Sequence, residues 1–170
     1  MIFDSHFEYE FASFLDSRSD VKTFVKNFEQ LNFKIEYQNR EKNIYYYHPD
    51  FIVKLNNGEH WVIETKGRLD ENDILKFKRL EQWCLDINKS GKVAEKWNCM
   101  MLMETKWREL VKTDLPSSYA DFIKLTKTWC KHIIVVFGPL DATFEKTRRC
   151  DRVLSRSHLR VLHTLPPGAQ

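Results

Sequence analysis

The chain has 170 residues and a formal net charge of +3 at pH 7, and 42% of its residues are hydrophobic. This length and composition fit one globular domain with a single core. No apolar run approaches the roughly 18 residues that predict a membrane span, and the N-terminus lacks a signal-peptide pattern, so we expect a soluble cytoplasmic protein with no membrane contact. The four cysteines have no C-x-x-C spacing, which excludes the usual zinc-ligand pattern and predicts reduced thiols.

The positive charge is concentrated near the C-terminus. Residues 146–170 hold six Lys or Arg against one Asp, a net charge of +5, which leaves −2 for residues 1–145. We predict that residues 1–145 form the domain. The segment 146–170 has no aromatic residue and is interpreted as a disordered basic arm, a cloning remnant or an out-of-frame extension. Because the domain is not basic as a whole, a nucleic acid would have to bind a local patch.

The first half of the chain predicts one helix followed by strands. Residues 5–17 form the helix, whose apolar residues recur at helical spacing, with a buried stripe of Phe7, Phe11, Phe14 and Leu15. Residues 21–27 are predicted to be a short helical or irregular piece. Strands rich in β-branched and aromatic residues follow at residues 33–38, 44–47, 50–55 and 61–66.

The second half predicts two more helices and two more strands. A long helix covers residues 70–87, and the short apolar run 98–104 predicts a strand whose methionines are core filler. A helix at residues 115–128 and a buried strand at residues 133–137 complete the pattern. This mixture predicts an α/β fold with a mixed β-sheet flanked by α-helices.

The turn between the strands 50–55 and 61–66 decides which side chains share a face. It contains Asn56-Asn57-Gly58, a strong hairpin signal. A two-residue turn would put Asp50 and Glu64 on opposite faces, because side chains alternate with period 2. A three-residue loop with Gly58 in the left-handed conformation instead pairs Asp50 with Glu64. We predict the second register, because it also puts every large apolar pair on one face.

That register predicts a metal site. The Cβ atoms of Asp50 and Glu64 would lie roughly 4.5 to 5.5 Å apart, with Lys66 on the same face at about 7 Å. Facing carboxylates repel unless a cation lies between them, and Mg²⁺, for which Mn²⁺ can substitute, commonly takes one or two protein carboxylates. Lys66 could then orient or deprotonate a water, or neutralise charge on a phosphate. The pattern is typical of metal-assisted phosphodiester hydrolysis.

A purely structural alternative explains the same residues. Two acids and a lysine on the polar face of a half-exposed hairpin are common, and a salt bridge between Glu64 and Lys66 would account for them. We favour the metal site because both residues end the run 61–63, which predicts a buried central strand where unpaired charge is costly.

Pro49-Asp50 followed by Glu64-Thr65-Lys66 resembles the motif of the PD-(D/E)xK nuclease superfamily. A longer pattern over about residues 3–68 is similar to the C-terminal endonuclease domain of type III restriction enzyme restriction (Res) subunits. It is carried by Ser5-His6-Phe7-Glu8, Phe11-Ala12, Leu15-Asp16, Asp20-Val21, Phe24-Val25-Lys26-Asn27, Phe33, Ile35, Tyr37, Tyr47, Pro49-Asp50-Phe51-Ile52-Val53 and Glu64-Thr65-Lys66-Gly67. The resemblance implies a restriction-endonuclease-like fold in which Asp50, Glu64 and the backbone carbonyl of Thr65 ligate Mg²⁺ and Lys66 serves the attacking water.

The resemblance also implies another acid from the first helix. Glu8 is its candidate, since it shares the helical stripe that faces the sheet. Ser5-x-x-Glu8 is equally a capping box, in which Glu8 would merely accept from the Ser5 N–H. Lys26 and Arg68 are possible DNA-binding residues through phosphate contacts, or ordinary solvated charges. His48 either supports the site or faces water.

We therefore expect a Mg²⁺-dependent DNA endonuclease domain. The resemblance implies a type III restriction system, with a helicase-like ATPase segment and a methyltransferase subunit as partners. No G-x-x-x-x-G-K-[ST] phosphate loop occurs, so no ATP site is expected in this chain. The alternatives are a catalytically inactive nuclease-fold module for DNA binding or subunit docking, and a nuclease of repair or recombination.

Overall fold

A mixed four-stranded sheet lies at the centre of the fold. In the computed structural model, which describes residues 3–28 and 31–126, its strands run in the order β1 (Val21–Lys26), β4 (Phe51–Leu55), β5 (His60–Lys66) and β6 (Trp97–Met103). The first three strands pair antiparallel, and β6 pairs parallel to β5. Helix α2 (Glu71–Lys89) makes the crossover connection that a parallel pair needs. The predicted α/β class with a mixed sheet is confirmed.

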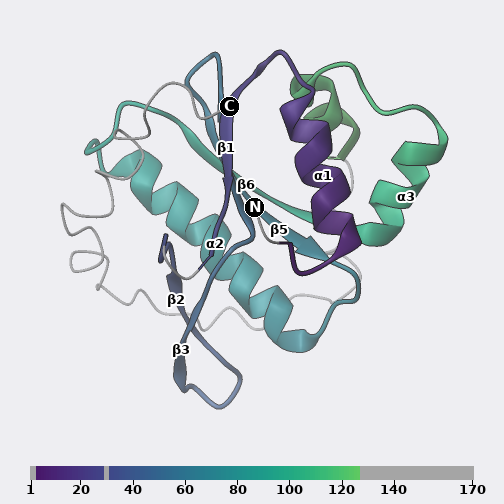
Figure 1. The fold of residues 1–170 in the computed structure, drawn as a ribbon. Helices are drawn as coiled ribbons and strands as arrows, with labels where there is room; N and C mark the ends of the chain where they lie inside the picture. Colours follow the sequence, from purple (N-terminus) through teal and green to yellow (C-terminus); the bar gives the residue numbers. More distant parts are fainter. Residues whose placement is uncertain (1–2, 29–30, 127–170) are drawn as a thin grey trace.

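Helices cover both faces of this sheet (Figure 1). Helix α1 (His6–Asp16), helix α3 (Glu104–Lys112) and a helical segment at residues 119–126 pack on one face, here called the α1 face. Helix α2 packs on the other, the α2 face, together with a small second sheet of β2 (Ile35–Gln38) and β3 (Ile44–Tyr47). Each face therefore has its own apolar core.

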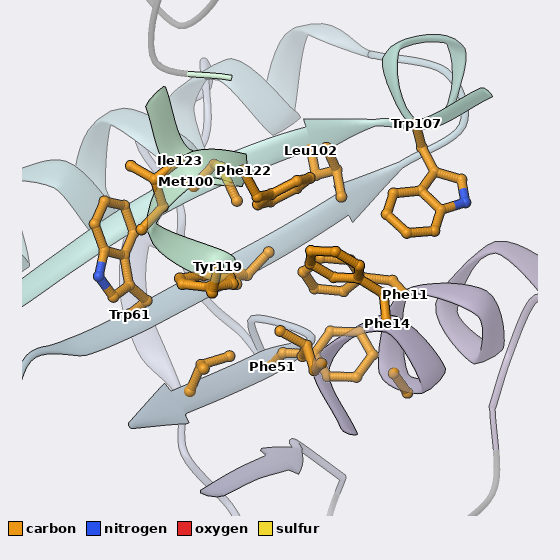
Figure 2. Packing of buried hydrophobic residues seen from close by; sticks show 14 of the residues in the cluster. Phe11, Phe14, Phe51, Trp61, Met100, Leu102, Trp107, Tyr119, Phe122 and Ile123 are labelled. Atoms are coloured by element: carbon orange, nitrogen blue, oxygen red, sulfur yellow. The ribbon is translucent and has the colours of Figure 1, made fainter. Parts of the chain in front are cut away.

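Aromatic rings fill the core of the α1 face (Figure 2). The ring of Phe11 is 0% exposed and lies edge-on to Phe51 at 5.4 Å and to Trp107 at 5.7 Å between ring centroids. The four apolar residues predicted for the buried stripe of the first helix are all buried. Ser5 begins the helix by accepting a 3.1 Å hydrogen bond from the Glu8 N–H. This packing fixes α1, and with it Glu8, against the sheet.

Strand β5 is buried on both sides. Trp61 and Ile63 point into the core of the α1 face, and Val62 points into the core of the α2 face. The predicted central strand is therefore confirmed. A carboxylate that continues this strand enters a protein interior rather than a solvated hairpin face.

Several predicted elements need correction. The helical or irregular piece predicted at residues 21–27 is wrong: this segment is β1, because hydrogen bonding to β4 decides a sequence whose local pattern is ambiguous. Helix α3 was not predicted, since it begins after Met103 without a side-chain cap. The helix predicted from residue 115 begins only at residue 119, where the Asp20 carboxylate accepts from two backbone N–H groups.

The remaining elements agree with the sequence analysis to within a few residues. The strand at residues 133–137, the domain end at 145 and the segment 146–170 lie outside the described residues. Cys84 and Cys99 form no disulfide. Across residues 3–28 and 31–126, every helix is too short or too polar to cross a bilayer.

We expect Phe11→Ala to lower the free energy of unfolding by about 3 to 5 kcal/mol, because it removes a fully buried ring from a packed core. Tyr9→Ala on the exposed side of the same helix is the matched control and should change the value by about 0.5 kcal/mol or less. Chemical denaturation measures both. Equal losses would contradict the orientation of α1.

Candidate active site

The hairpin of β4 and β5 has the register that the sequence predicts. The Leu55 N–H donates to the Glu59 carbonyl at 2.9 Å, and Gly58 adopts φ +88°. Phe51 pairs with Ile63 and Val53 with Trp61. The three-residue loop is therefore confirmed, and the same register puts Asp50 level with Glu64.

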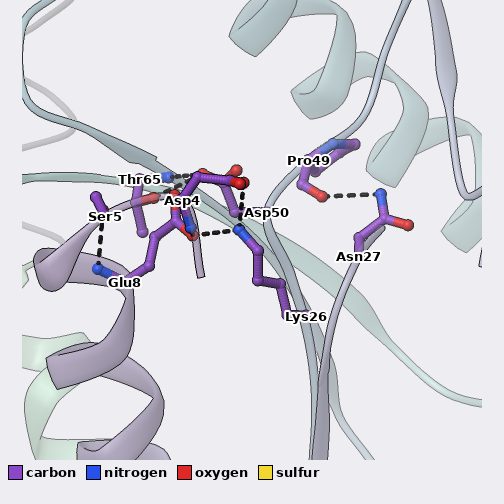
Figure 3. A network of polar contacts seen from close by, with 8 residues as sticks. All are labelled: Asp4, Ser5, Glu8, Lys26, Asn27, Pro49, Asp50 and Thr65. Atoms are coloured by element: carbon purple, nitrogen blue, oxygen red, sulfur yellow. Dashed lines mark hydrogen bonds and ion pairs between the residues drawn. The ribbon is translucent and has the colours of Figure 1, made fainter. Parts of the chain in front are cut away.

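Asp50 lies immediately before β4, and Thr65 holds its side chain (Figure 3). Oδ2 of Asp50 accepts from the Thr65 N–H at 2.7 Å and from the Thr65 hydroxyl at 2.6 Å. The neighbouring Pro49 carbonyl accepts instead from the Asn27 side chain at 2.9 Å. At the end of the β4–β5 pair, the Thr65 N–H therefore donates to the Asp50 carboxylate rather than to the Pro49 carbonyl. Both of its hydrogen bonds fall on Oδ2, which leaves Oδ1 for another ligand.

Glu64 is 5% exposed and faces α2. Its Oε1 forms a 2.9 Å ion pair with the Lys66 ammonium, while its buried Oε2 has no hydrogen-bond partner within the described part of the chain. Burial, followed by the charge of Asp50, raises the pKa of Glu64 to about 7. The two carboxylates therefore interact, and a buried acceptor without a partner is costly unless a proton or a cation satisfies it.

Lys66 lies between two carboxylates. Its ammonium is 2.9 Å from Glu64 Oε1 and 3.2 Å from Asp73 Oδ1. Burial lowers the pKa of Lys66, but these two carboxylates outweigh it and raise the pKa above its ordinary value. The side chain is therefore a fixed positive charge at the end of β5.

The sequence analysis missed Asp73. It is buried at the start of α2, where it forms a reciprocal capping box with Asp70, and its Oδ1 also accepts from Lys76 at 3.1 Å. Burial acts to raise the pKa of Asp73, but these hydrogen bonds and the Lys66 charge lower it overall. The Asp70-x-x-Asp73 spacing signals a helix start, but nothing local shows that it also holds a lysine from β5.

Glu8 also lies beside Asp50. The Glu8 carboxylate, 7% exposed, accepts from the Asp4 N–H at 3.1 Å and forms an ion pair with Lys26. The capping-box alternative is only half right, because Ser5 caps the Glu8 N–H while the Glu8 side chain turns to Asp4. Burial raises the pKa of Asp50 and the Thr65 hydrogen bonds lower it; Glu8 raises it and Lys26 lowers it, with a net rise.

Lys26 is 3% exposed and its ammonium bridges two acids, Glu8 and Asp4, the latter at 2.8 Å. It is not the solvated surface charge that one alternative predicted. Of the other three sequence candidates, Thr65 lies next to Asp50, and Arg68 and His48 are exposed on the segments that flank the site. A phosphate contact by Arg68 stays a prediction, and so does a metal bond from the Thr65 carbonyl.

The donor set fits Mg²⁺ with few protein ligands. Within residues 3–28 and 31–126, no three His, Cys, Asp or Glu side chains are grouped as a ready metal site, and lysines form ion pairs with Glu8 and Glu64. At the end of one hairpin, Asp50 Oδ1 and Glu64 Oε2 nevertheless lack hydrogen bonds from the described residues and could act as metal ligands. Mg²⁺ takes one or two carboxylates and completes its shell with water.

Tyr47, named in the sequence analysis only as part of the resemblance, is a second neighbour of the site. It ends β3 on the α2 face, and its buried hydroxyl has no hydrogen-bond partner among the described residues. Burial, followed by the charge of Glu64, raises the pKa of Tyr47 well above its ordinary value, so its phenol stays neutral beside the site.

Comparison of the chain with protein-family models, curated proteins and solved structures found no match in any of the three. The function has to be argued from the site itself, because a fold class hosts many activities.

In EDTA, we expect the protein to lose stability as the pH rises from about 4.5 through about 7. Glu64 keeps its proton in the folded state over this range, whereas the unfolded chain releases it, so the free energy of unfolding falls and then levels off. Glu64→Gln has no ionisable group at this position. Its free energy of unfolding should therefore not show the fall of up to about 3 kcal/mol that wild type shows between pH 5 and 8.

Chemical denaturation across this pH range gives the comparison. Glu109→Gln, an exposed residue on α3, is the control and should follow wild type. If Glu64→Gln followed wild type as well, the raised pKa of Glu64 would be disproved.

Proposed function

We propose that the protein is a Mg²⁺-dependent DNA endonuclease domain of the PD-(D/E)xK type, with a restriction-endonuclease-like fold. The observation that carries the proposal is the register of β4 and β5, which puts Asp50 and Glu64 at one end of the hairpin with Lys66 beside them. A mixed sheet flanked by helices on both faces supports it.

Asp50 and Glu64 would hold the metal through Oδ1 and Oε2. Bound Mg²⁺ would supply a Lewis acid at the scissile phosphate. Thr65 keeps Asp50 aimed by two hydrogen bonds, and its backbone carbonyl is the proposed third protein ligand. Burial of Glu64 removes competing water, which strengthens the attraction between its carboxylate and a cation.

Lys66 would stabilise negative charge on the phosphate. An ammonium that touches two carboxylates keeps its proton, so it suits charge stabilisation and the orientation of water better than proton abstraction. Asp73 is a positioning residue, because it would retain Lys66 when Glu64 turns towards the cation. In the reaction, the water oxygen bonds to phosphorus and the bond to the 3′-oxygen breaks. The 3′-oxygen gains a proton, the attacking water loses one to solvent, and the ends are 5′-phosphate and 3′-hydroxyl.

Glu8 is the proposed additional acid of the site. Its carboxylate is neutralised by Lys26, so it would reach a cation only when that ion pair opens. While the pair is closed, Lys26 compensates the charge that Glu8 adds beside Asp50. This charge compensation allows the Glu8 carboxylate to lie beside Asp50.

The proposed setting is a type III restriction system in the cytoplasm. A helicase-like ATPase segment and a methyltransferase subunit would be the partners, since the sequence has no phosphate loop of its own. DNA would be positioned by these partners and by local contacts such as Arg68, because residues 1–145 carry a net negative charge.

A second candidate function is an inactive nuclease-fold module that binds DNA or docks a subunit. Two observations favour it. Lys66 already neutralises Glu64, and no three His, Cys, Asp or Glu side chains form a metal-binding group among the described residues. The nicking experiment below separates the two functions.

We expect the wild-type protein with Mg²⁺ or Mn²⁺ to nick supercoiled plasmid. Lys66→Ala should nick it at least about 100-fold more slowly, because a positive charge at the reacting phosphate is lost. Gel electrophoresis over a time course gives both rates. Lys96→Ala removes an exposed lysine that forms an ion pair with Glu59, and this variant should cleave like wild type.

Thermal unfolding of the same preparations shows whether each variant is folded. Equal cleavage by wild type and Lys66→Ala would mean that the chemistry lies elsewhere. No cleavage by wild type with either metal would favour the inactive module.

A further inference from the structure

The hairpin of β2 and β3 lies outside the central sheet and forms a separate two-stranded sheet. The chain leaves the sheet at the end of β1 and returns to it at β4, and these two strands are hydrogen-bonded neighbours. The central sheet is therefore complete without the hairpin. Figure 1 shows the hairpin projecting from the body of the domain beside α2. Its inner residues, Ile35 and Tyr47, join the core of the α2 face, but its outer part needs another explanation.

The outer part exposes three consecutive large side chains. Ile44 is 55% exposed, Tyr45 48% and Tyr46 55%, whereas most large apolar residues of the described chain are buried. Because side chains alternate along a strand, Tyr45 and Tyr46 point to opposite faces of this two-stranded sheet. The hairpin thus offers one ring on each face.

A lysine lies over the Tyr46 ring, and another lies over Tyr37, the ring neighbour of Tyr45. The Lys34 ammonium lies 5.0 Å from the centroid of the Tyr46 ring. On the other face, the Tyr45 ring lies 6.1 Å from the Tyr37 ring, and the Lys76 ammonium lies 5.9 Å from that second ring. On the Tyr46 face of the hairpin, here called the outer face, the Glu36 carboxylate accepts from the Tyr46 hydroxyl at 3.4 Å.

The Tyr45 face of the hairpin, here called the inner face, connects to the proposed active site through contacts between aromatic rings. Ring contacts run from Tyr45 to Tyr37 and from Tyr37 to Tyr47, the last at 6.2 Å, and Tyr47 lies beside Glu64. Tyr46 and Asp50 are also close along the chain, since three residues lie between them and the four residue steps span at most about 14 Å of extended backbone. A ligand held by the hairpin is therefore within a few nucleotides of the two carboxylates.

We propose that Tyr45 and Tyr46 bind unpaired bases and deliver a single-stranded segment of DNA to the Asp50–Glu64 site. The inference rests on the proposed nuclease function and adds the substrate class. A base offers its face to a protein ring only where it is not stacked inside a duplex, so exposed rings favour unpaired bases. The Lys34 ammonium beside Tyr46 matches a phosphate between the bases.

Fluorescence anisotropy with a labelled oligothymidine of about 15 nucleotides tests the proposal, in EDTA so that no cleavage occurs. We expect the double variant Tyr45→Ala/Tyr46→Ala to bind the single strand about 10- to 100-fold more weakly than wild type. Blunt duplex of the same length should be bound equally by both proteins. Tyr45→Phe/Tyr46→Phe keeps the rings and should retain most of the single-strand affinity.

Tyr9→Ala is the matched control, because it removes an equally exposed tyrosine from α1, on the opposite face of the sheet. It should bind the single strand like wild type. Unchanged single-strand binding by the alanine double variant would overturn the proposal. So would an equal loss of duplex binding, or a wild-type dimer in sedimentation velocity that the double variant abolishes, which would make the hairpin a self-association surface.

The proposed nuclease function can fail separately. If wild type shows tyrosine-dependent binding of the single strand but nicks no plasmid, the binding surface stands and catalysis does not. If wild type nicks plasmid through Lys66 and the tyrosines do not matter for binding, the nuclease stands and the hairpin proposal is wrong.

Discussion

The bend at Gly58 is the constraint on which the whole site depends. A three-residue loop sets the pairing of β4 with β5, and a shift of one residue would send every side chain of β5 to the other face. Trp61 and Ile63 would then leave the core of the α1 face, so apolar packing and the turn enforce the same register. The position of Glu64 level with Asp50 is a consequence of that packing.

Charge balance is the second theme of the structure. Acids and lysines alternate around the end of the hairpin: Lys26 joins Asp4 to Glu8, and Lys66 joins Glu64 to Asp73. Buried carboxylates are tolerated because each has a cation or donor nearby. Among the described residues, the buried Glu64 Oε2 has no hydrogen-bond partner, so this oxygen is available to an incoming cation. In the part of the chain that the structure describes, no three His, Cys, Asp or Glu side chains form a group that could hold a metal.

Local sequence was enough to predict the hairpin, its register, the first two helices and the α/β class, because alternation, capping and the Gly58 turn act over a few residues. It failed where distant segments decide. β1 is a strand because of its partner, and this also buries Lys26. Asp73 reaches the site only through the packing of α2, and Tyr47 only through the folding back of the small sheet. Such contacts leave no spacing in the sequence that analysis could find.

Crystals grown with Mn²⁺ test the central claim most directly, since an anomalous difference map locates that ion without reference to the protein. The account predicts a peak in contact with Asp50 and Glu64 in the wild-type protein, and no peak at that position in Asp50→Asn. A wild-type map without density between these two carboxylates, or the same peak in the variant, would contradict it.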